Sequence, residues 1–268
     1  MLSAGAGPAT LVRLVHVRTT DASCACAFTR SQILELFHDV TYQTSCGQLI
    51  DLITAPIGQA RGFAIACMRP AYFGCVGLQV DLSKYTIETY MRIVTYKTAF
   101  YTFYLPAASA MHLCGIEDER AFDLARDICV RLGQFFQIQD DYLDCYGDPA
   151  VIGKVGTDIE DNKCSWLVVQ ALARCSDAQR KVFEVRCCPG PCQCFVSLTR
   201  VPQLNYGQND PAKVAAIKAV YAELKLEAVY HEYESKSFEE LTALINSQDL
   251  LPKALFGDML AKIYKRQK

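Results

Sequence analysis

The stretch Q-F-F-Q-I-Q-D-D-Y-L-D-C-Y-G-D-P, residues 134–149, decides how the rest of the chain is read. Within it Gln137, Asp140, Asp141 and Asp144 stand at i, i+3, i+4 and i+7, a spacing that places them on one face of a helix. Positions with this spacing normally carry apolar side chains into a core, whereas here they carry an amide and three carboxylates. Because unpaired carboxylates are costly to bury, the stretch predicts a helix whose acidic face meets water, cations or both.

Three carboxylates within two helical turns repel one another unless a positive charge lies between them. Oxygen ligands of this kind suit Mg²⁺, which keeps several waters and shares its coordination shell with substrate phosphates. Lys154 and Lys163 follow closely in the chain, and lysine ammonium groups bind the outer oxygens of a diphosphate. The pattern therefore indicates Mg²⁺ bound by Asp140, Asp141 and Asp144 beside a diphosphate. The alternative is an acidic, solvent-exposed helix face with ordinary surface lysines.

Composition bounds the remaining possibilities. A chain of 268 residues with 51% hydrophobic content can bury a large core. The formal net charge of -2 and the pI of about 6.1 give no electrostatic reason to expect a nucleic-acid partner. No run of about 18 uninterrupted apolar residues occurs, so no membrane span is expected. The 14 cysteines would suggest a disulfide scaffold in a short secreted chain, but this chain is long and helix-patterned.

Three motifs resemble those of the farnesyl diphosphate synthases, the short-chain trans-prenyltransferases, in their eukaryotic form. They are F-F-Q-I-Q-D-D-Y-L-D at 135–144, G-T-D-I-E-D-N-K-C-S-W at 156–166 and Y-K-T-A-F-Y-T-F-Y-L-P at 96–106. The resemblance implies an all-α, isoprenoid-synthase-type helical bundle. It also implies a Mg²⁺-dependent transferase that condenses isopentenyl diphosphate with dimethylallyl or geranyl diphosphate, and a homodimer.

Carried over residue by residue, the resemblance assigns roles to individual side chains. Asp140 and Asp144 would hold one Mg²⁺, and Asp141 would support them. The allylic diphosphate would be bound by three lysines: Lys97, Lys154 and Lys163. The catalytic candidates, which would face the allylic carbocation or its diphosphate, are Lys97, Thr98 and Gln137.

The organisation along the chain follows from composition and pattern. Residues 1–32 are rich in Ala, Ser, Thr and Arg, which fits an organelle transit peptide, a disordered leader or an artefactual one; the expected compartment is the cytoplasm. Residues 33–268 form the expected helical domain, interrupted by two irregular insertions at about 60–79 and 185–203. Pro106 predicts a kink in the helix that carries Lys97.

The sequence also departs from the family pattern. It contains one D-D-x-x-D, whereas the family uses two facing each other, so we expect an N-terminally truncated bundle with little or no prenyltransferase turnover. Residues 1–32 and the two insertions each end in glutamine: Gln32, Gln79 and Gln203. A retained intron translated in frame would end in the same way, because its 3′ end reads as the glutamine codon CAG. A mis-spliced gene model and a non-catalytic subunit that pairs with an intact synthase stay open as alternatives. A terpene cyclase is disfavoured by the lysines and by D-N-K-C-S-W.

Overall fold

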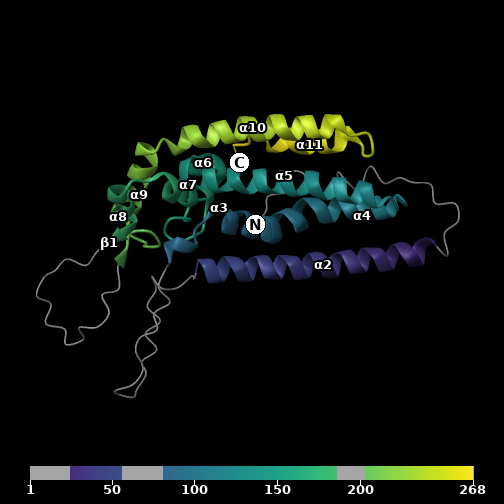
Figure 1. Cartoon of the computed structure of the whole chain (residues 1–268), viewed down its shortest axis with the longest axis horizontal. Coiled ribbons are helices and arrows are strands. Elements are labelled where there is room, and N and C mark those ends of the chain that lie inside the picture. Colours follow the sequence, from purple (N-terminus) through teal and green to yellow (C-terminus); the bar gives the residue numbers. More distant parts are fainter. Residues whose placement is uncertain (1–24, 56–80, 186–202, 268) are drawn as a thin grey trace, which may run out of the picture. The chain divides into compact units, whose positions relative to one another are not determined.

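The computed structural model describes residues 25–55, 81–185 and 203–267, which form helices joined by short turns (Figure 1). The all-α class predicted from the sequence is confirmed, since the strands in these ranges are two residues long each. None of the described helices has the length and apolar content needed to cross a bilayer. In chain order the elements are α2 (Ala25–Thr54), the 3-10 helix η1 (Leu82–Lys84), α3 (Ile87–Val94), the π-helix η2 (Thr95–Tyr104), α4 (Leu105–Leu113), α5 (Glu119–Tyr146), α6 (Pro149–Ile152), α7 (Trp166–Arg174), α8 (Asp177–Phe183), β1 (Glu184–Val185), β2 (Gln203–Leu204), α9 (Pro211–Glu223), α10 (Leu226–Ser247) and α11 (Lys253–Ile263).

The described residues divide into two compact units, and the long helices α2, α5 and α10 each contribute to both. The first unit contains residues 25–49, 91–137 and 234–266. The second unit contains residues 50–55, 81–90, 138–185, 203–233 and 267. The three groups predicted to be catalytic therefore belong to the first unit, and the three predicted metal ligands to the second.

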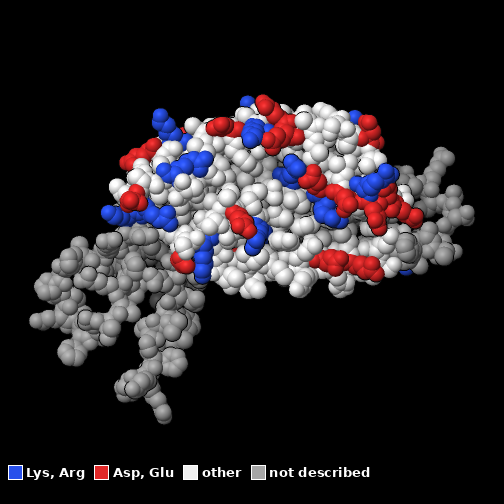
Figure 2. Space-filling model, in the orientation of Figure 1, with Lys and Arg blue, Asp and Glu red and all other residues white. Residues whose placement is uncertain are grey.

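The core of the first unit is built around one face of α5. Ala125, Ile128, Leu132 and Phe135 recur at helical spacing and are fully buried. The opposite face carries ion pairs between neighbouring turns, such as Arg131 Nε to Asp127 Oδ1 at 2.9 Å. Figure 2 shows acidic and basic side chains interspersed in this way on the face in view. α5 is therefore an amphipathic helix up to the point where its carboxylates begin.

The helical run from α3 to α4 changes its winding where Lys97 and Thr98 lie. η2 is a π-helix, and at its end the Leu105 N–H donates to the Phe100 carbonyl, five residues back. Pro106 follows in the first turn of α4, where its missing N–H is tolerated. The irregularity predicted at Pro106 thus takes the form of a π-helix just before it, and π-helical turns are frequent at functional sites.

η2 approaches its neighbours in the first unit at two glycines. A Cβ on Gly133 of α5 would lie 2.4 Å from the Ala99 Cβ, and one on Gly47 of α2 would lie 2.4 Å from the Lys97 backbone nitrogen. Both distances are far shorter than a van der Waals contact. Only glycine at these positions lets the helix backbones come this close.

The second unit is held by side-chain caps and stacked aromatic rings. Asp148 accepts the Ala150 N–H at the start of α6, and Asp210 accepts the Ala212 N–H at the start of α9, each followed by proline. The rings of Tyr142 in α5 and Tyr230 in α10 stack with centroids 3.8 Å apart. These contacts fix the carboxylate-bearing end of α5 against α10.

α2 begins at Ala25, within the stretch 1–32 for which the sequence pattern predicts a leader. The insertion at about 60–79 lies outside the described residues, and so do the leader before residue 25 and all but the ends of the insertion at 185–203. Those two ends are described: Val185 and Gln203 pair as antiparallel strands.

Candidate active site

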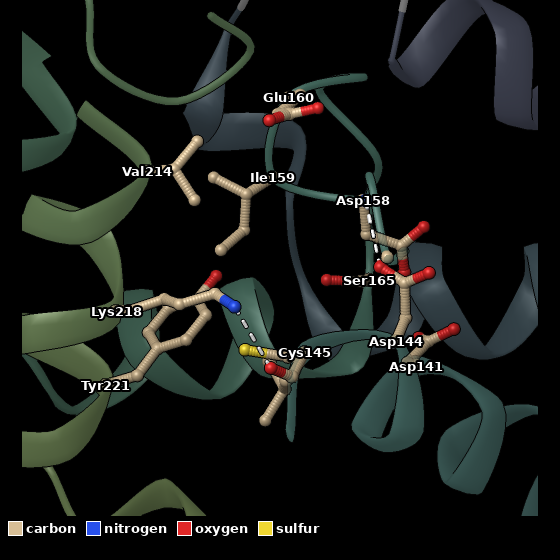
Figure 3. A pocket seen from close by; sticks show the side chains of 12 residues that line it. Asp141, Asp144, Cys145, Asp158, Ile159, Glu160, Ser165, Val214, Lys218 and Tyr221 are labelled. Carbon is tan, nitrogen blue, oxygen red and sulfur yellow. Dashed lines mark hydrogen bonds between the residues drawn. The ribbon is translucent and has the colours of Figure 1, made fainter. Parts of the chain in front are cut away.

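The C-terminal end of α5 presents the predicted metal ligands to the loop of residues 156–165. The Trp166 N–H donates to Asp141 Oδ2 at 2.7 Å, and the Asp158 N–H donates to Asp144 Oδ2 at 2.9 Å. Figure 3 shows the second of these bonds and the carboxylates of Asp144 and Asp158 lying close together. The loop is therefore attached to α5 through the carboxylates themselves.

Asp141 is 6% exposed, so of the two partners expected for the acidic face, water and cations, it does not face water. Its position continues the buried face of α5. The bond from the Trp166 N–H compensates part of the cost of burying a carboxylate there. Asp140 and Asp144 are partly exposed, and Asp144 is the more accessible of the two that contact the loop.

Asp158 adds a fourth carboxylate that sequence reasoning did not single out. Burial raises its pKa to about 8, and the negative charges of Asp141 and Asp144 contribute in the same direction. A signal was present in the sequence, because Asp158 stands in the G-T-D motif next to two lysines that were predicted to bind diphosphate. The fold concentrates negative charge here beyond what the D-D-x-x-D alone supplies.

The two lysines of the second unit lie against carboxylates. Lys154 Nζ is 3.7 Å from Asp144 Oδ1, and Lys163 Nζ is 3.6 Å from Asp51 Oδ2. Asp51 lies near the end of α2 and is buried, and it is a fifth carboxylate that the predicted set did not contain. The structure thus places Lys154 beside the predicted metal ligand Asp144 and pairs Lys163 with Asp51, a neighbour of the site.

In the first unit, two of the predicted catalytic residues touch. Thr98 Oγ1 donates to Gln137 Oε1 at 3.0 Å, and a second bond one turn away joins Gln134 Nε2 to Thr95 Oγ1 at 2.9 Å. Lys97 lies beside Thr98 in η2 and is half-buried. These bonds join η2 to α5, and the roles of Lys97, Thr98 and Gln137 remain predictions.

The donor atoms at the end of α5 suit a hard divalent cation. In the described part of the chain, no group of three or more His, Cys, Asp or Glu side chains is already arranged to hold a metal ion. Burial raises the pKa of Asp158, and the nearby negative charges of Asp141 and Asp144 raise it further. A cation would relieve that part of the repulsion. Asp144 Oδ1 lies 3.7 Å from the ammonium group of Lys154, whose side chain is largely exposed. By donor type and charge, the residues present fit Mg²⁺.

A small pocket lies beside these carboxylates, and residues of α9 form part of its lining (Figure 3). Lys218 and Tyr221 of α9 line it together with Asp144 and Asp158. Lys218 Nζ donates to the Cys145 carbonyl at 3.1 Å. This carbonyl lies in the last turn of α5, where the negative end of the helix dipole favours a cation. Neither α9 residue was predicted, because nothing in the local sequence marks a surface lysine of a later helix as a cap for α5.

Comparison with known proteins identifies the relatives of this arrangement. Residues 13–188 match the family model described as polyprenyl synthetase, and this match starts inside the segment predicted to be a leader. The chain is 47% identical to the farnesyl pyrophosphate synthase of Rattus norvegicus over 237 residues, covering 88% of this chain and 56% of that protein. It is 42% identical to the farnesyl pyrophosphate synthase of Schizosaccharomyces pombe over 239 residues, covering 88% and 58%. The chain thus spans a little over half the length of these relatives.

A solved structure agrees with the sequence relatives. The structure of the T. brucei farnesyl diphosphate synthase complexed with risedronate superposes with a TM-score of 0.68 at 32% identity, covering 89% of this chain and 60% of that one. The isoprenoid-synthase-type bundle predicted from the three motifs is therefore confirmed as the fold.

Proposed function

This chain belongs to the polyprenyl synthetase family, and we propose that it provides the Mg²⁺- and diphosphate-binding part of a prenyltransferase site like that of the farnesyl diphosphate synthases. The substrates we propose are an allylic diphosphate, dimethylallyl or geranyl, and isopentenyl diphosphate. The observation that carries the proposal is the carboxylate cluster of Asp141, Asp144 and Asp158 with Lys154 beside it. Such a cluster is stable only with countercharge or with a proton on one of its carboxyl groups.

The proposed roles follow from the contacts. Bound Mg²⁺ would neutralise charge on the departing diphosphate, held by Asp140 and Asp144 with Asp141 in support. Asp141 is already oriented by the Trp166 N–H. Lys154 is 55% exposed at its side chain and only 3.7 Å from Asp144, so it can turn from the carboxylate to a phosphate oxygen when the metal takes its place.

Lys163 has the same choice between two anionic partners. It now lies 3.6 Å from Asp51, and its side chain is 30% exposed. A diphosphate carries more negative charge than one carboxylate and would draw the ammonium group to itself. The third lysine of the proposal, Lys97, would bind the same diphosphate from η2.

Thr98 and Gln137 are proposed to stabilise the positive charge that develops when the diphosphate departs. The Thr98 hydroxyl donates its hydrogen bond to Gln137 Oε1, so the lone pairs of the Thr98 oxygen can point at a positively charged carbon. Preorganised dipoles of this kind stabilise a transition state without reorganising. Their hydrogen bond fixes that orientation before substrate binds.

The direct test is equilibrium binding of geranyl diphosphate by the full 268-residue chain, with Mg²⁺ and with EDTA. We expect binding that depends on Mg²⁺ and weakens by more than about tenfold in Asp144→Asn, since a metal ligand is lost. A product assay with isopentenyl diphosphate should show little turnover, because the chain holds a single D-D-x-x-D. Binding that is equal in EDTA would contradict the proposed site.

A dimer with a second copy or with an intact synthase is proposed as the assembly. The observation favouring it is α2, which leaves several large apolar side chains largely exposed: Leu34, Tyr42, Leu49 and Ile53. Exposed apolar surface of this kind often marks an interface. Light scattering of the chain alone, and mixed with an intact synthase, tests this, and a monomer in both samples would overturn it.

A further inference from the structure

Two buried tyrosines from distant parts of the second unit meet the backbone of the loop that carries Lys163. Tyr85 OH donates to the Asn162 carbonyl at 2.9 Å, and Tyr206 OH donates to the Lys163 carbonyl at 2.6 Å. The two residues are 3% and 0% exposed. Their rings meet edge to face, with centroids 6.3 Å apart and planes at 88°. Consecutive carbonyls of one loop are thus held by one aromatic pair.

The loop turns at Asn162, which has a φ of 57°. This left-handed conformation is rare outside glycine, although asparagine adopts it more readily than most other residues. Lys163 directly follows this turn. The Lys163 N–H donates to the Asp158 carbonyl at 3.0 Å, and the Gly207 N–H donates to the Ile159 carbonyl at 2.8 Å. The loop is therefore fixed at both faces of the turn.

The two tyrosines come from segments that lie far from the loop along the chain. Tyr85 directly follows η1, and Tyr206 lies two residues after β2. Desolvation by burial raises the pKa of both hydroxyls well above the ordinary value for tyrosine. Both groups therefore remain protonated, and able to donate, throughout the neutral pH range.

We propose that Tyr85 and Tyr206 are positioning residues that hold the Lys163 ammonium in place for a diphosphate by fixing the carbonyls of Asn162 and Lys163. We call the two hydrogen bonds from Tyr85 and Tyr206 to the loop carbonyls the tyrosine clamp. The inference rests on the proposed function, since it assigns the purpose of the clamp to diphosphate binding. It adds to that function two residues that touch neither the diphosphate nor the metal. Lys154, which is borne by a different turn after α6, is outside the reach of the clamp.

The test is a double-mutant cycle in the full chain, with binding of inorganic diphosphate in the presence of Mg²⁺ as the measurement. Removing one hydrogen bond in Tyr206→Phe should weaken binding about fivefold. In the Lys163→Ala background the same change should have an effect of less than about twofold, because the side chain that the clamp positions is gone. In the Lys154→Ala background the effect should again be about fivefold. Equal weakening in all three backgrounds would show a merely structural role and overturn the proposal.

Hydrogen exchange of residues 156–166, measured without ligand, separates the clamp from the proposed function. Tyr206→Phe and Tyr85→Phe should each speed exchange in this segment, and Tyr104→Phe, which alters a buried tyrosine of the other unit, should not. If Tyr206→Phe does not fold, Tyr85→Phe carries the same cycle. Unchanged exchange in the loop overturns the clamp. Faster exchange together with a parent chain that binds no diphosphate overturns the proposed function, and with it the purpose assigned to the clamp.

Discussion

The π-helix η2 and the loop of residues 156–165 each carry groups for which a role in diphosphate chemistry is proposed, and they are positioned by different means. η2 carries Lys97 and Thr98 on a helix whose own backbone hydrogen bonds fix it, and it packs closely on α2 and α5 at Gly47 and Gly133. The loop carries Lys163 on irregular backbone, and its carbonyls are fixed by the tyrosine side chains of Tyr85 and Tyr206. η2 is positioned by its own backbone hydrogen bonds and by close packing at glycines, with side-chain hydrogen bonds at Thr95 and Thr98 in addition. The loop depends on side-chain hydrogen bonds to its backbone carbonyls.

The largest effect is expected from filling the close contact of η2. Gly133→Ala places a methyl group 2.4 Å from the Ala99 Cβ, so the helices must move apart, and we expect a net loss of about 2 kcal/mol in the free energy of unfolding. Gly257→Ala is the matched control, because a Cβ at this position in α11 of the same unit meets nothing within 4 Å. It should stabilise the chain by about 0.5–1 kcal/mol through helix propensity. Denaturant unfolding measures the change in free energy for both variants. Equal changes would contradict the claim that close packing at Gly133 positions η2.

An intermediate effect is expected from pH, and it concerns the loop. The folded chain raises the pKa of Asp158 to about 8, whereas an unfolded aspartate titrates near about 4. The protonated form is thus favoured by folding, so this contribution to stability is fully present below about pH 4 and is lost as the pH rises through about 8. In EDTA, the melting temperature of the unmutated chain should fall relative to that of Asp158→Asn as the pH rises from about 5 to about 8.

Added Mg²⁺ should reduce that loss, since a cation stabilises the charged carboxylate. The control is the same pair of proteins at a fixed pH near 5, where Mg²⁺ should matter little. Parallel melting profiles of the parent and Asp158→Asn over the whole range would show that Asp158 is not the group that titrates.

The smallest effect is expected from the side-chain bond of η2. Thr98→Val removes the donor to Gln137 Oε1 and should cost about 1 kcal/mol of unfolding free energy, while Thr98→Ser keeps the hydroxyl and should cost less. Because the backbone bonds of η2 do not depend on Thr98, hydrogen exchange of residues 95–104 should be unchanged in both variants. Faster exchange there would mean that the helix, like the loop, depends on side-chain hydrogen bonds.

The same division explains what could be predicted from the sequence. The acidic spacing of Asp140, Asp141 and Asp144 correctly placed these residues on one helix, because helical periodicity is local. The motif around Lys97 correctly indicated a helix, but neither its π-helical winding nor its close approach to α5 at Gly133, which is far away in the sequence.

The loop was predicted less well, because its geometry comes from residues far away in the chain. Thr157 Oγ1 donates to Asp161 Oδ2 at 2.8 Å within the loop, and the next helix, α7, begins only at Trp166. The bonds from Tyr85 and Tyr206 span long sequence separations, and no local pattern announces them.

The central claim is that the end of α5 and its loop bind a divalent cation together with a diphosphate. Electron paramagnetic resonance of Mn²⁺, used in place of Mg²⁺ and titrated into the full chain with inorganic diphosphate, tests it most directly. We expect a bound Mn²⁺ signal that increases with diphosphate, is lost in Asp144→Asn and is kept in Asp148→Asn, where the asparagine can still cap α6. A bound signal that is the same in both variants would contradict the account.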